Sequence, residues 1–456
     1  MKSNKWVNFF LITMLFCYSC SKEEKLTNKV SEEFPGGETT YPNIFSGAFQ
    51  QPAPNLSSAE LIQHDAGDAN FSAIFIESPA IKNFGLGSIF NQNSCISCHV
   101  KDGRSPQPFS GDDLKGLLFR LSIPGADAHG GPLDVPGFGG QLQNKAVVGT
   151  PAEAKVQLSF SETNFTFEDG TPYTLRKPIY TLVAPYIPFP ASVMVSPRIG
   201  SQVYGLGLLE AIRESDILAN EDIADINGDG ISGKANKVWN PLSKNIELGR
   251  FGWKANVSKL IIQVAGALNQ DMGLTSFVFP QESSFYQSQY DGRSDDPEVD
   301  SQFVVDLTFY TQTLAVPKRR DFNNSSVLKG KQVFIKIGCN KCHTPSYVTG
   351  SGISPALNNQ TIYPYTDLLL HDMGADLADN RPDFLANGNE WRTPPLWGIG
   401  LFPLINGHSN LLHDGRARNV LEAIMWHGGE AEQQKQKVKK LSATEREDLL
   451  KFINSL

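Results

Sequence analysis

The stretches Cys95-Ile96-Ser97-Cys98-His99 and Cys339-Asn340-Lys341-Cys342-His343 repeat one pattern, C-x-x-C-H. This pattern is the attachment signal of c-type haem. Its two cysteines bond the porphyrin and its histidine ligates the iron, so His99 and His343 are the expected proximal ligands. A zinc site made from the four cysteines would leave both histidines without a role. The sequence therefore predicts two covalently bound haem c groups.

The first residues have the pattern of an export signal. Lys2 and Lys5 precede an apolar run, 6–16, that is too short to span a membrane. Cys20 follows Ser19 and resembles the lipidated cysteine of a bacterial lipoprotein, although Cys17 stands where such signals usually carry leucine. We expect an exported protein on the periplasmic face or outer membrane of a Gram-negative bacterium, attached to the membrane by a lipid on Cys20. A plain secretory signal is the alternative.

Composition and length limit the class of protein. The 456 residues carry a net charge of -8 and contain no block of Lys or Arg, so nucleic acid is not an expected partner. The length indicates more than one domain. The predicted divisions are a lipoprotein-type signal at 1–20, a flexible tether at 21–54, a first haem domain at 55–315 with a β insertion around 150–190, and a second haem domain at 316–456.

The chain repeats itself loosely after each C-x-x-C-H motif. This favours a mainly α fold, with two tandem cytochrome-c-like haem domains, long loops and a small β insertion. Apolar residues at helical spacing predict helices over 257–268, 420–426 and 439–453. Alternating residues predict strands over 156–160, 165–167 and 173–175, with a hairpin turn at Asp169-Gly170.

Four segments carry a resemblance to a known family: Cys95 to Arg104, Gly249 to Ala255, Leu370 to Gly374 and Leu412 to Ala417. From about Gly85 to the C-terminus, the chain resembles the di-haem oxidoreductases, sometimes called thiol oxidoreductases. It is more distantly similar to bacterial di-haem cytochrome c peroxidases and to MauG. The resemblance implies two haem domains, in which one haem accepts electrons and the other reacts with peroxide.

The sixth ligand distinguishes an electron-transfer haem from a reactive one, because only an open iron binds peroxide. Aligning Trp253 with His413 places Ala267 opposite His427. Alanine cannot ligate iron, whereas His427 stands where the related peroxidases carry an axial methionine and MauG a tyrosine. We expect the second haem to be held by His343 and His427 and the first to be open or weakly capped. Met373 is the rival sixth ligand, and a structural histidine is the alternative for His427.

The resemblance also suggests residues beside the first haem. The peroxidases carry a tryptophan, then a glutamine and a glutamate, and here Trp253, Gln263 and Asp271 follow in that order. Asp271 is the candidate acid–base for peroxide, Gln263 would orient it, and Trp253 would relay electrons between the haems. The chain departs from the pattern at Lys254, and Asp271 replaces glutamate at a shorter spacing. A core tryptophan, a buried amide and a helix-end aspartate are the structural alternatives.

Further histidines and one arginine are weaker candidates. His129 lies in a glycine-rich loop that could cap the first haem, although a surface histidine is the alternative. His413 and Arg416 belong to one family segment, in which Arg416 would bind a haem propionate or make an inter-domain contact. An Arg–Asp pair explains Arg416 equally well. His371 would pack around the haem edge.

Asp225, Asn227 and Asp229 place oxygen ligands at alternate positions, with Gly230 sixth, as at the start of a calcium loop. The twelfth residue is Asn236 and not the usual glutamate. Calcium is therefore a possible ligand, and a plain Gly/Asp turn is the alternative.

Together these patterns predict an enzyme, a di-haem peroxidase. It would take electrons at the second haem from a small cytochrome or cupredoxin and reduce hydrogen peroxide at the first. An electron-transfer lipoprotein without peroxide chemistry, a MauG-like oxidase of a protein or small molecule, and an oxygenase remain as alternatives. The spin state of each haem separates the first two classes.

Overall fold

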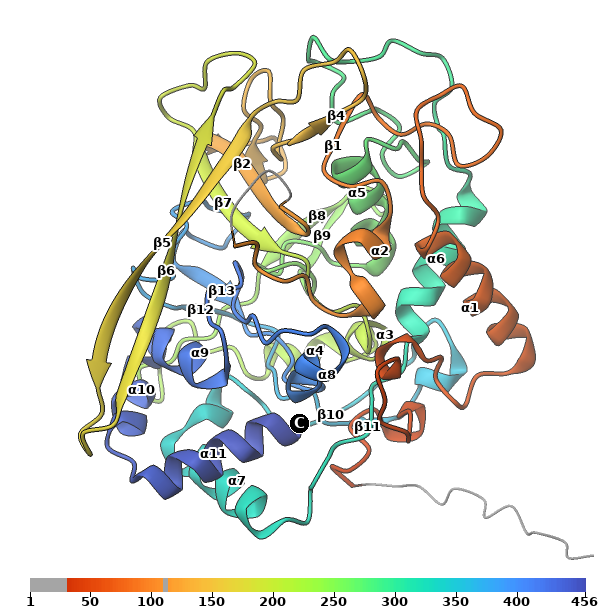
Figure 1. Cartoon of the computed structure of the whole chain (residues 1–456). Helices are drawn as coiled ribbons and strands as arrows, with labels where there is room; N and C mark the ends of the chain where they lie inside the picture. Colours follow the sequence, from red (N-terminus) through yellow and green to blue (C-terminus); the bar gives the residue numbers. More distant parts are fainter. Residues whose placement is uncertain (1–30, 110–113) are drawn as a thin grey trace, which may run out of the picture.

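The computed structural model describes residues 31–109 and 114–456 (Figure 1). The predicted signal, including Cys20, lies outside the described residues. The α-helices of five or more residues in the described ranges are α1 (Ser58–Phe71), α3 (Leu206–Glu210), α4 (Glu214–Leu218), α5 (Leu260–Met272), α6 (Ser301–Thr313), α7 (Ser325–Ile337), α9 (Val420–Trp426), α10 (Glu432–Lys439) and α11 (Ala443–Ser455). The short helices α2 (Cys95–Cys98) and α8 (Phe402–Ile405) complete the set. The three predicted helices correspond to α5, α9 and α11, so they are confirmed.

Two pairs of helices cross at a glycine, one pair in each half of the chain. α1 packs on α6, and a Cβ at Gly67 would lie 2.2 Å from the carbonyl oxygen of Asp306. α7 packs on α11, and a Cβ at Gly330 would lie 1.9 Å from the carbonyl oxygen of Asp448. Only glycine permits so close an approach of two backbones. Each crossing lies beside one C-x-x-C-H motif, because Phe71 of α1 faces His99 and Phe334 of α7 faces His343.

The prediction of a mainly α fold is wrong. The structure is 28% helix and 19% strand, and the described residues form six separate sheets. The largest has three strands in the order β3 (Pro132–Leu133), β2 (Leu117–Ala126) and β7 (Met194–Ile199). The two-stranded sheets pair β1 (Ile89–Phe90) with β4 (Lys145–Ala146), β5 (Lys155–Thr166) with β6 (Pro172–Val183), β8 (Lys237–Asn240) with β9 (Asn245–Leu248), β10 (Tyr347–Val348) with β11 (Thr361–Ile362), and β12 (Leu370–Asp372) with β13 (Glu390–Arg392). Most of these strands are too short to show a twofold alternation in the sequence.

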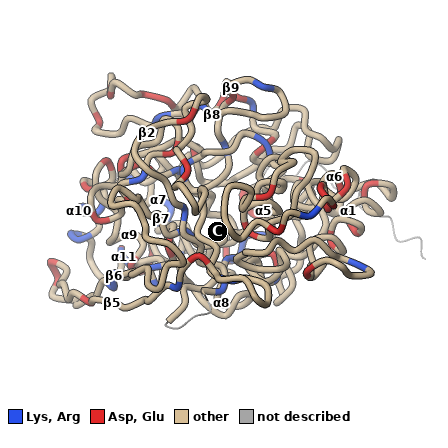
Figure 2. The backbone as a smooth tube through the Cα atoms, turned by 90° about the horizontal axis from the view of Figure 1, so that it is seen from above, with Lys and Arg blue, Asp and Glu red and all other residues tan. Residues whose placement is uncertain are grey.

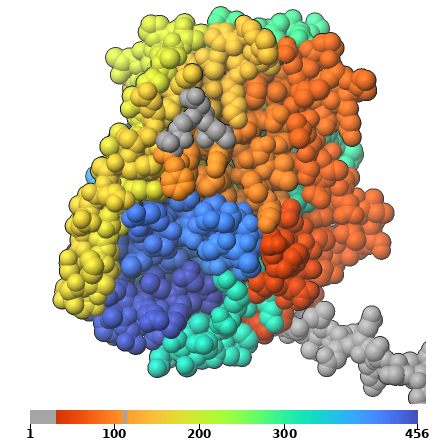
Figure 3. Space-filling view, viewed as in Figure 1, coloured from red at the N-terminus to blue at the C-terminus, as the bar shows by residue number. Residues whose placement is uncertain are grey.

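The predicted hairpin is confirmed, but it is much longer than expected. β5 and β6 pair antiparallel over their whole length, from Lys155 with Val183 to Thr166 with Pro172. This ribbon extends from the first half of the chain along the C-terminal part (Figures 1 and 3). Near its tip Arg446 donates to Asp169 at 2.8 Å, and further along Arg418 donates to Glu162 at 2.9 Å. The β insertion therefore contacts both halves.

The described part of the predicted tether, residues 31–54, packs on the rest of the protein. Arg319 pairs with Glu32 at 2.6 Å, and the Tyr41 amide donates to the Val316 carbonyl at 2.9 Å. Phe49 is fully buried and stacks on Tyr204, with 4.1 Å between ring centroids. This segment is therefore part of the folded structure, and the flexible tether expected as far as residue 54 is not observed over 31–54.

One hydrophobic cluster runs from Ala48 to Leu456 and includes residues of both halves. Charges of both signs are interspersed along the backbone (Figure 2). Within the described ranges, no helix is both long and apolar enough to cross a membrane. The division into domains at residue 315 stays a prediction.

Candidate functional site

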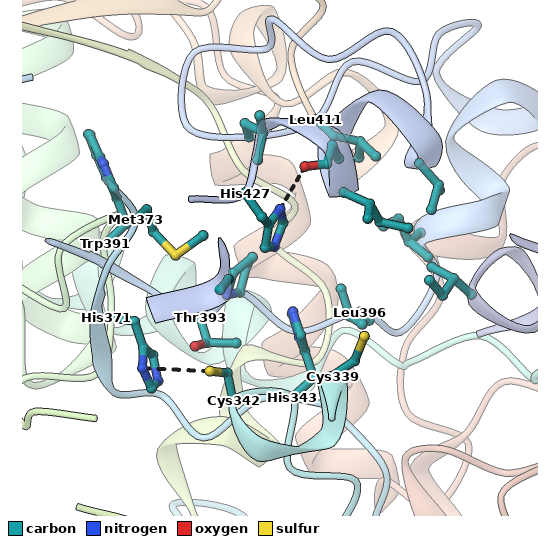
Figure 4. A pocket seen from close by; sticks show the side chains of 18 of the residues that line it. Cys339, Cys342, His343, His371, Met373, Trp391, Thr393, Leu396, Leu411 and His427 are labelled. Carbon is teal, nitrogen blue, oxygen red and sulfur yellow. Dashed lines mark hydrogen bonds between the residues drawn. The ribbon is translucent and has the colours of Figure 1, made fainter. Parts of the chain in front are cut away.

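A largely apolar cavity lies beside the second motif, Cys339–His343 (Figure 4). Its volume is about 1390 Å³, including space open to solvent. Both cysteines and the histidine of the motif line it. The other residues used below that line it are Arg104, Gln202, Trp253, His371, Met373, Trp391, Arg392, His413 and His427. We call it the second-motif cavity.

His343 and His427 both line this cavity, and each is held by a backbone carbonyl. Nδ1 of His343 donates to the Tyr365 carbonyl at 3.0 Å, and Nδ1 of His427 donates to the Ala423 carbonyl at 2.6 Å. A carbonyl oxygen only accepts, so each ring is fixed with its proton on Nδ1 and an unprotonated Nε2. Burial lowers the pKa of His343 to about 4 and also lowers the pKa of His427. Two neutral imidazoles therefore offer Nε2 to one cavity, as a pair of metal ligands would.

α9 places His427 at its C-terminal end. The Asn419 side chain caps the start of α9 by accepting from the Glu422 amide, and the helix ends at Trp426. Met373 follows β12 and reaches the same cavity from another side, with its thioether sulfur visible in Figure 4. The structure thus brings both predicted sixth ligands to the cavity of His343.

The cavity also contains polar groups that suit a ligand carrying carboxylates. The Arg104 Nε and the Gln202 Oε1 are buried and have no hydrogen-bond partner among the described residues. Arg392 adds a second guanidinium. A haem has two propionates, and guanidinium–carboxylate pairing is strong in a buried site. An apolar cavity with two imidazoles, two thiols and unpartnered polar groups therefore fits haem c.

Arg416 forms the Arg–Asp pair that was the alternative to a propionate contact. Its guanidinium pairs with Asp414 at 2.9 Å and donates to the Asp376 carbonyl at 2.6 Å. It also lies over the Trp426 ring, 4.8 Å from the centroid, and it does not line the cavity. The Arg–Asp pair is the arrangement observed.

His371 lies at the edge of the cavity between two carboxylates. Its Nε2 is 2.8 Å from Asp367 and its Nδ1 is 2.7 Å from Glu430. Nδ1 also lies 3.6 Å from the Cys342 sulfur (Figure 4). Burial alone would lower the pKa of His371, but the charges of Asp367 and Cys342 and the hydrogen bonds to them together outweigh it and hold the pKa well above its ordinary value. The side chain is therefore an imidazolium held against the second motif.

The first motif is built on α2. Nδ1 of His99 donates to the Ser201 carbonyl at 2.7 Å, so this ring too is fixed with an unprotonated Nε2. The two cysteine pairs lie at separate sites, and no group of four cysteines forms within the part of the chain that the structure describes. A single zinc site made from all four cysteines is therefore not observed.

α5 carries three of the predicted first-site residues on one face. Gln263, Ala267 and Asp271 are four residues apart, which is the spacing of neighbours along a helix. The Asp271 carboxylate accepts from the Gln141 amide at 2.7 Å. Burial mainly raises the pKa of the Cys95 thiol to about 12, with a further contribution from the Asp271 charge. Asp271 therefore lies close to the first motif.

Trp253 is connected to both sites. Its ring lines the second-motif cavity, and its Nε1 donates to the Ile199 carbonyl at 2.9 Å. Two residues further along, the Ser201 carbonyl accepts from His99. The neighbouring Lys254, at the departure from the family pattern, is fully buried and pairs with Asp379 at 2.8 Å.

The chain is similar to a known protein family over almost its whole length. The family model described as "Di-haem oxidoreductase, putative peroxidase" matches residues 30–456. The chain belongs to this di-haem oxidoreductase family. No curated protein matches it. Among solved structures, hydrazine synthase from Kuenenia stuttgartiensis is similar at 14% identity, with 100% of each chain covered and a TM-score of 0.36.

The remaining predicted residues of this di-haem oxidoreductase lie elsewhere or make structural contacts. His129 is exposed and stacks on Trp239, with 3.9 Å between ring centroids. His413 lines the second-motif cavity and stacks on Trp391 at 3.8 Å. Neither contact involves a residue of the first motif.

The possible calcium loop turns its oxygens onto its own backbone. Asp225 accepts from the Asp229 amide at 2.9 Å, and so does Asn227. Asp229 pairs with Lys341 of the second motif at 2.8 Å. Calcium binding stays a prediction.

Arg104, Gln202, Arg392 and Gln141 were missed as candidates. Arg104 stands in the quoted segment Cys95 to Arg104, so its place in the family pattern was a usable signal. That segment follows the first motif, however, and nothing local indicates that Arg104 reaches the second. No signal in the sequence indicated the other three.

Proposed function

We propose that this di-haem oxidoreductase is a peroxidase with two covalently attached haem c groups, which takes up electrons at the second motif and reduces hydrogen peroxide at the first. When bound, the haems supply irons that exchange electrons and, where the sixth position is open, bind peroxide. The proposal rests on one difference between the two sites, the presence of a second histidine. His427 shares a cavity with His343, whereas α5 offers Ala267 at the matching position of the repeat.

The second site suits electron transfer. Two imidazoles fixed through Nδ1 would cap an iron on both sides, which leaves no position for peroxide. Met373 lines the same cavity, but its flexible side chain has no contact comparable to the Ala423 hydrogen bond. His427 is therefore our preferred sixth ligand. The charges of Arg104 and Arg392 would hold the propionates.

The first site suits acid–base work on peroxide. Burial raises the pKa of Asp271, while the Gln141 amide and the Arg120 charge lower it, with burial the largest effect. A carboxyl group tuned in this way takes a proton from one oxygen of peroxide and returns it to the other, so that water leaves instead of hydroxide. Gln263, on the same face of α5, would orient the peroxide.

Trp253 would relay electrons between the sites. It lines the second-motif cavity and bonds to the segment that holds His99. A buried indole in this position can pass electrons or hold an oxidising equivalent briefly.

The test is the spin state and peroxide reactivity of each haem, in the oxidised and half-reduced holoprotein. We expect one low-spin and one high-spin haem, with peroxide reacting only at the high-spin one. Two low-spin haems and no reaction in any redox state would favour the electron-transfer alternative. An active first site with an oxidised protein substrate, and no turnover with a small donor, would favour the MauG-like alternative.

We further propose export and a lipid on Cys20, with a small cytochrome or cupredoxin as donor. Mass spectrometry of the mature protein tests the first proposal, since a lipidated N-terminus at Cys20 would be heavier than the bare chain.

A further inference from the structure

Gln141 is the side chain that donates to the Asp271 carboxylate. Its Nε2 lies 2.7 Å from Asp271 Oδ1. The same Nε2 lies 2.7 Å from the Asn91 side-chain oxygen and 3.1 Å from the Gln270 carbonyl. The amide nitrogen has two N–H donors for these three acceptors, so one N–H is shared. The orientation of the amide is fixed, because the flipped form would place its oxygen against three oxygens.

The backbone holds Gln141 equally firmly. Residue 141 pairs with Arg120 of β2 in an antiparallel bridge. On either side of it, Leu121 donates to the Gly140 carbonyl and Leu142 donates to the Phe119 carbonyl, both at 2.9 Å. The side chain is 1% exposed, and its Oε1 has no partner among the described residues. A buried amide with an unpaired acceptor costs stability, so the contacts of Gln141 point to a functional role.

We infer that Gln141 is the positioning residue of the first site: its amide fixes the orientation of the Asp271 carboxylate beside the first motif. The inference rests on the proposed function and deepens it. The role given to Gln263 by sequence concerns the peroxide itself, whereas Gln141 acts through Asp271.

The charges around Asp271 show why a donor is needed. Burial disfavours the ionised carboxylate, and an N–H donor favours it. Arg120 of β2 contributes an opposite charge, whereas Gln141 donates a hydrogen bond to the carboxylate itself. The Cys95 thiol, on α2, is the other titratable group that senses Asp271. Gln141 is thus the direct contact that opposes burial.

Gln143 offers a matched control two residues away. It is also 1% exposed, has an unpartnered Oε1, and donates to the same Gln270 carbonyl, at 2.6 Å. It has no hydrogen bond to Asp271. Gln141→Met and Gln143→Met therefore remove similar buried amides, and only the first removes the donor to Asp271.

The experiment uses both variants as holoproteins, with cyanide as the probe of the oxidised first site. Hydrogen cyanide deposits its proton on a nearby base when it binds, so its binding rate against pH reports on Asp271 without turnover. In Gln141→Met we expect the rising limb of the profile to move up by about one pH unit, with roughly tenfold slower binding near pH 6. The reaction with peroxide should slow in parallel, while Gln143→Met stays within about twofold of wild type.

A second variant covers poor folding of Gln141→Met. Gln141→Glu keeps the shape but places a carboxyl group against Asp271, so the two must share a proton and the limb should move further up. Profiles that are the same for both methionine variants, or unmoved in Gln141→Glu, would refute the inference while the peroxidase function stands. A wild-type protein that binds cyanide but does not react with peroxide would refute the function and leave the positioning role measurable. A wild type that binds no cyanide would overturn both, because the first site would then not be open.

Discussion

The Arg104 guanidinium lies over the Trp253 ring, with its Cζ 5.1 Å from the ring centroid. Arg104 follows the first motif by five residues, yet both side chains line the second-motif cavity. The backbone segment of one C-x-x-C-H motif therefore supplies a charge to the cavity of the other.

Arg104→Gln should lower the midpoint potential of the second haem. A positive charge nearby favours the reduced iron, and its removal from a buried site takes that stabilisation away. Arg104→Lys keeps the charge and should retain most of the potential. Spectroelectrochemical titration of the low-spin haem measures both. Equal shifts in the two variants would show that packing over Trp253 matters and that the charge does not.

Trp253→Phe should slow electron transfer between the haems by about tenfold, equivalent to about 1.4 kcal/mol of barrier. Phenylalanine keeps an apolar ring but is harder to oxidise. Rapid mixing of the half-reduced protein with peroxide measures the rate. Trp391→Phe is the matched control, since Trp391 is also buried, lines the same cavity and donates to a backbone carbonyl. Similar slowing in both variants would rule out a specific relay.

His427→Gly should convert the second haem from low spin to high spin, because the variant removes the sixth ligand. Met373→Leu should leave the spectrum unchanged. Electron paramagnetic resonance of the oxidised protein distinguishes the two forms. A high-spin second haem in Met373→Leu, with an unchanged spectrum in His427→Gly, would assign Met373 as the ligand and leave His427 as a structural histidine.

His371→Gln should destabilise the protein most at low pH. The folded pKa of His371 is raised above its unfolded value of about 6.5, so the stabilisation is fully present below that value and is lost as pH rises through the folded pKa. Thioether formation removes the Cys342 charge, but Asp367 remains. We expect a loss of about 3 kcal/mol near pH 6, measured by denaturant unfolding. The difference from wild type should narrow toward high pH, and a gap independent of pH would exclude a buried imidazolium.

The sequence was sufficient where the signal was local or repeated. The two motifs are contiguous strings, and the repeat predicts that His427 accompanies His343, with which it shares a cavity. α9 begins and ends at the predicted residues because it has an Asn419 cap and a regular apolar face. Local chemistry determines these features.

The rest depends on contacts between distant segments. Arg104 is held in the second-motif cavity by donating a hydrogen bond to the Leu412 carbonyl. Gln141 donates a hydrogen bond to Asp271, which lies 130 residues further along the chain. β12 and β13 have three residues each, too few to show a period, and they form because they pair with one another. The prediction of a mainly α fold was wrong for the same reason: most strands are too short to show a period in the sequence.

The ribbon of β5 and β6 has a consequence for how the protein is made. An isolated two-stranded hairpin is at best marginally stable in water. Its tip is held by Arg446, 277 residues beyond Asp169, and by the Lys439 carbonyl, which accepts from the Glu168 amide. The tip of the ribbon therefore gains these contacts only after the C-terminal residues have folded. A protease cut near its tip would report incomplete maturation of the second half.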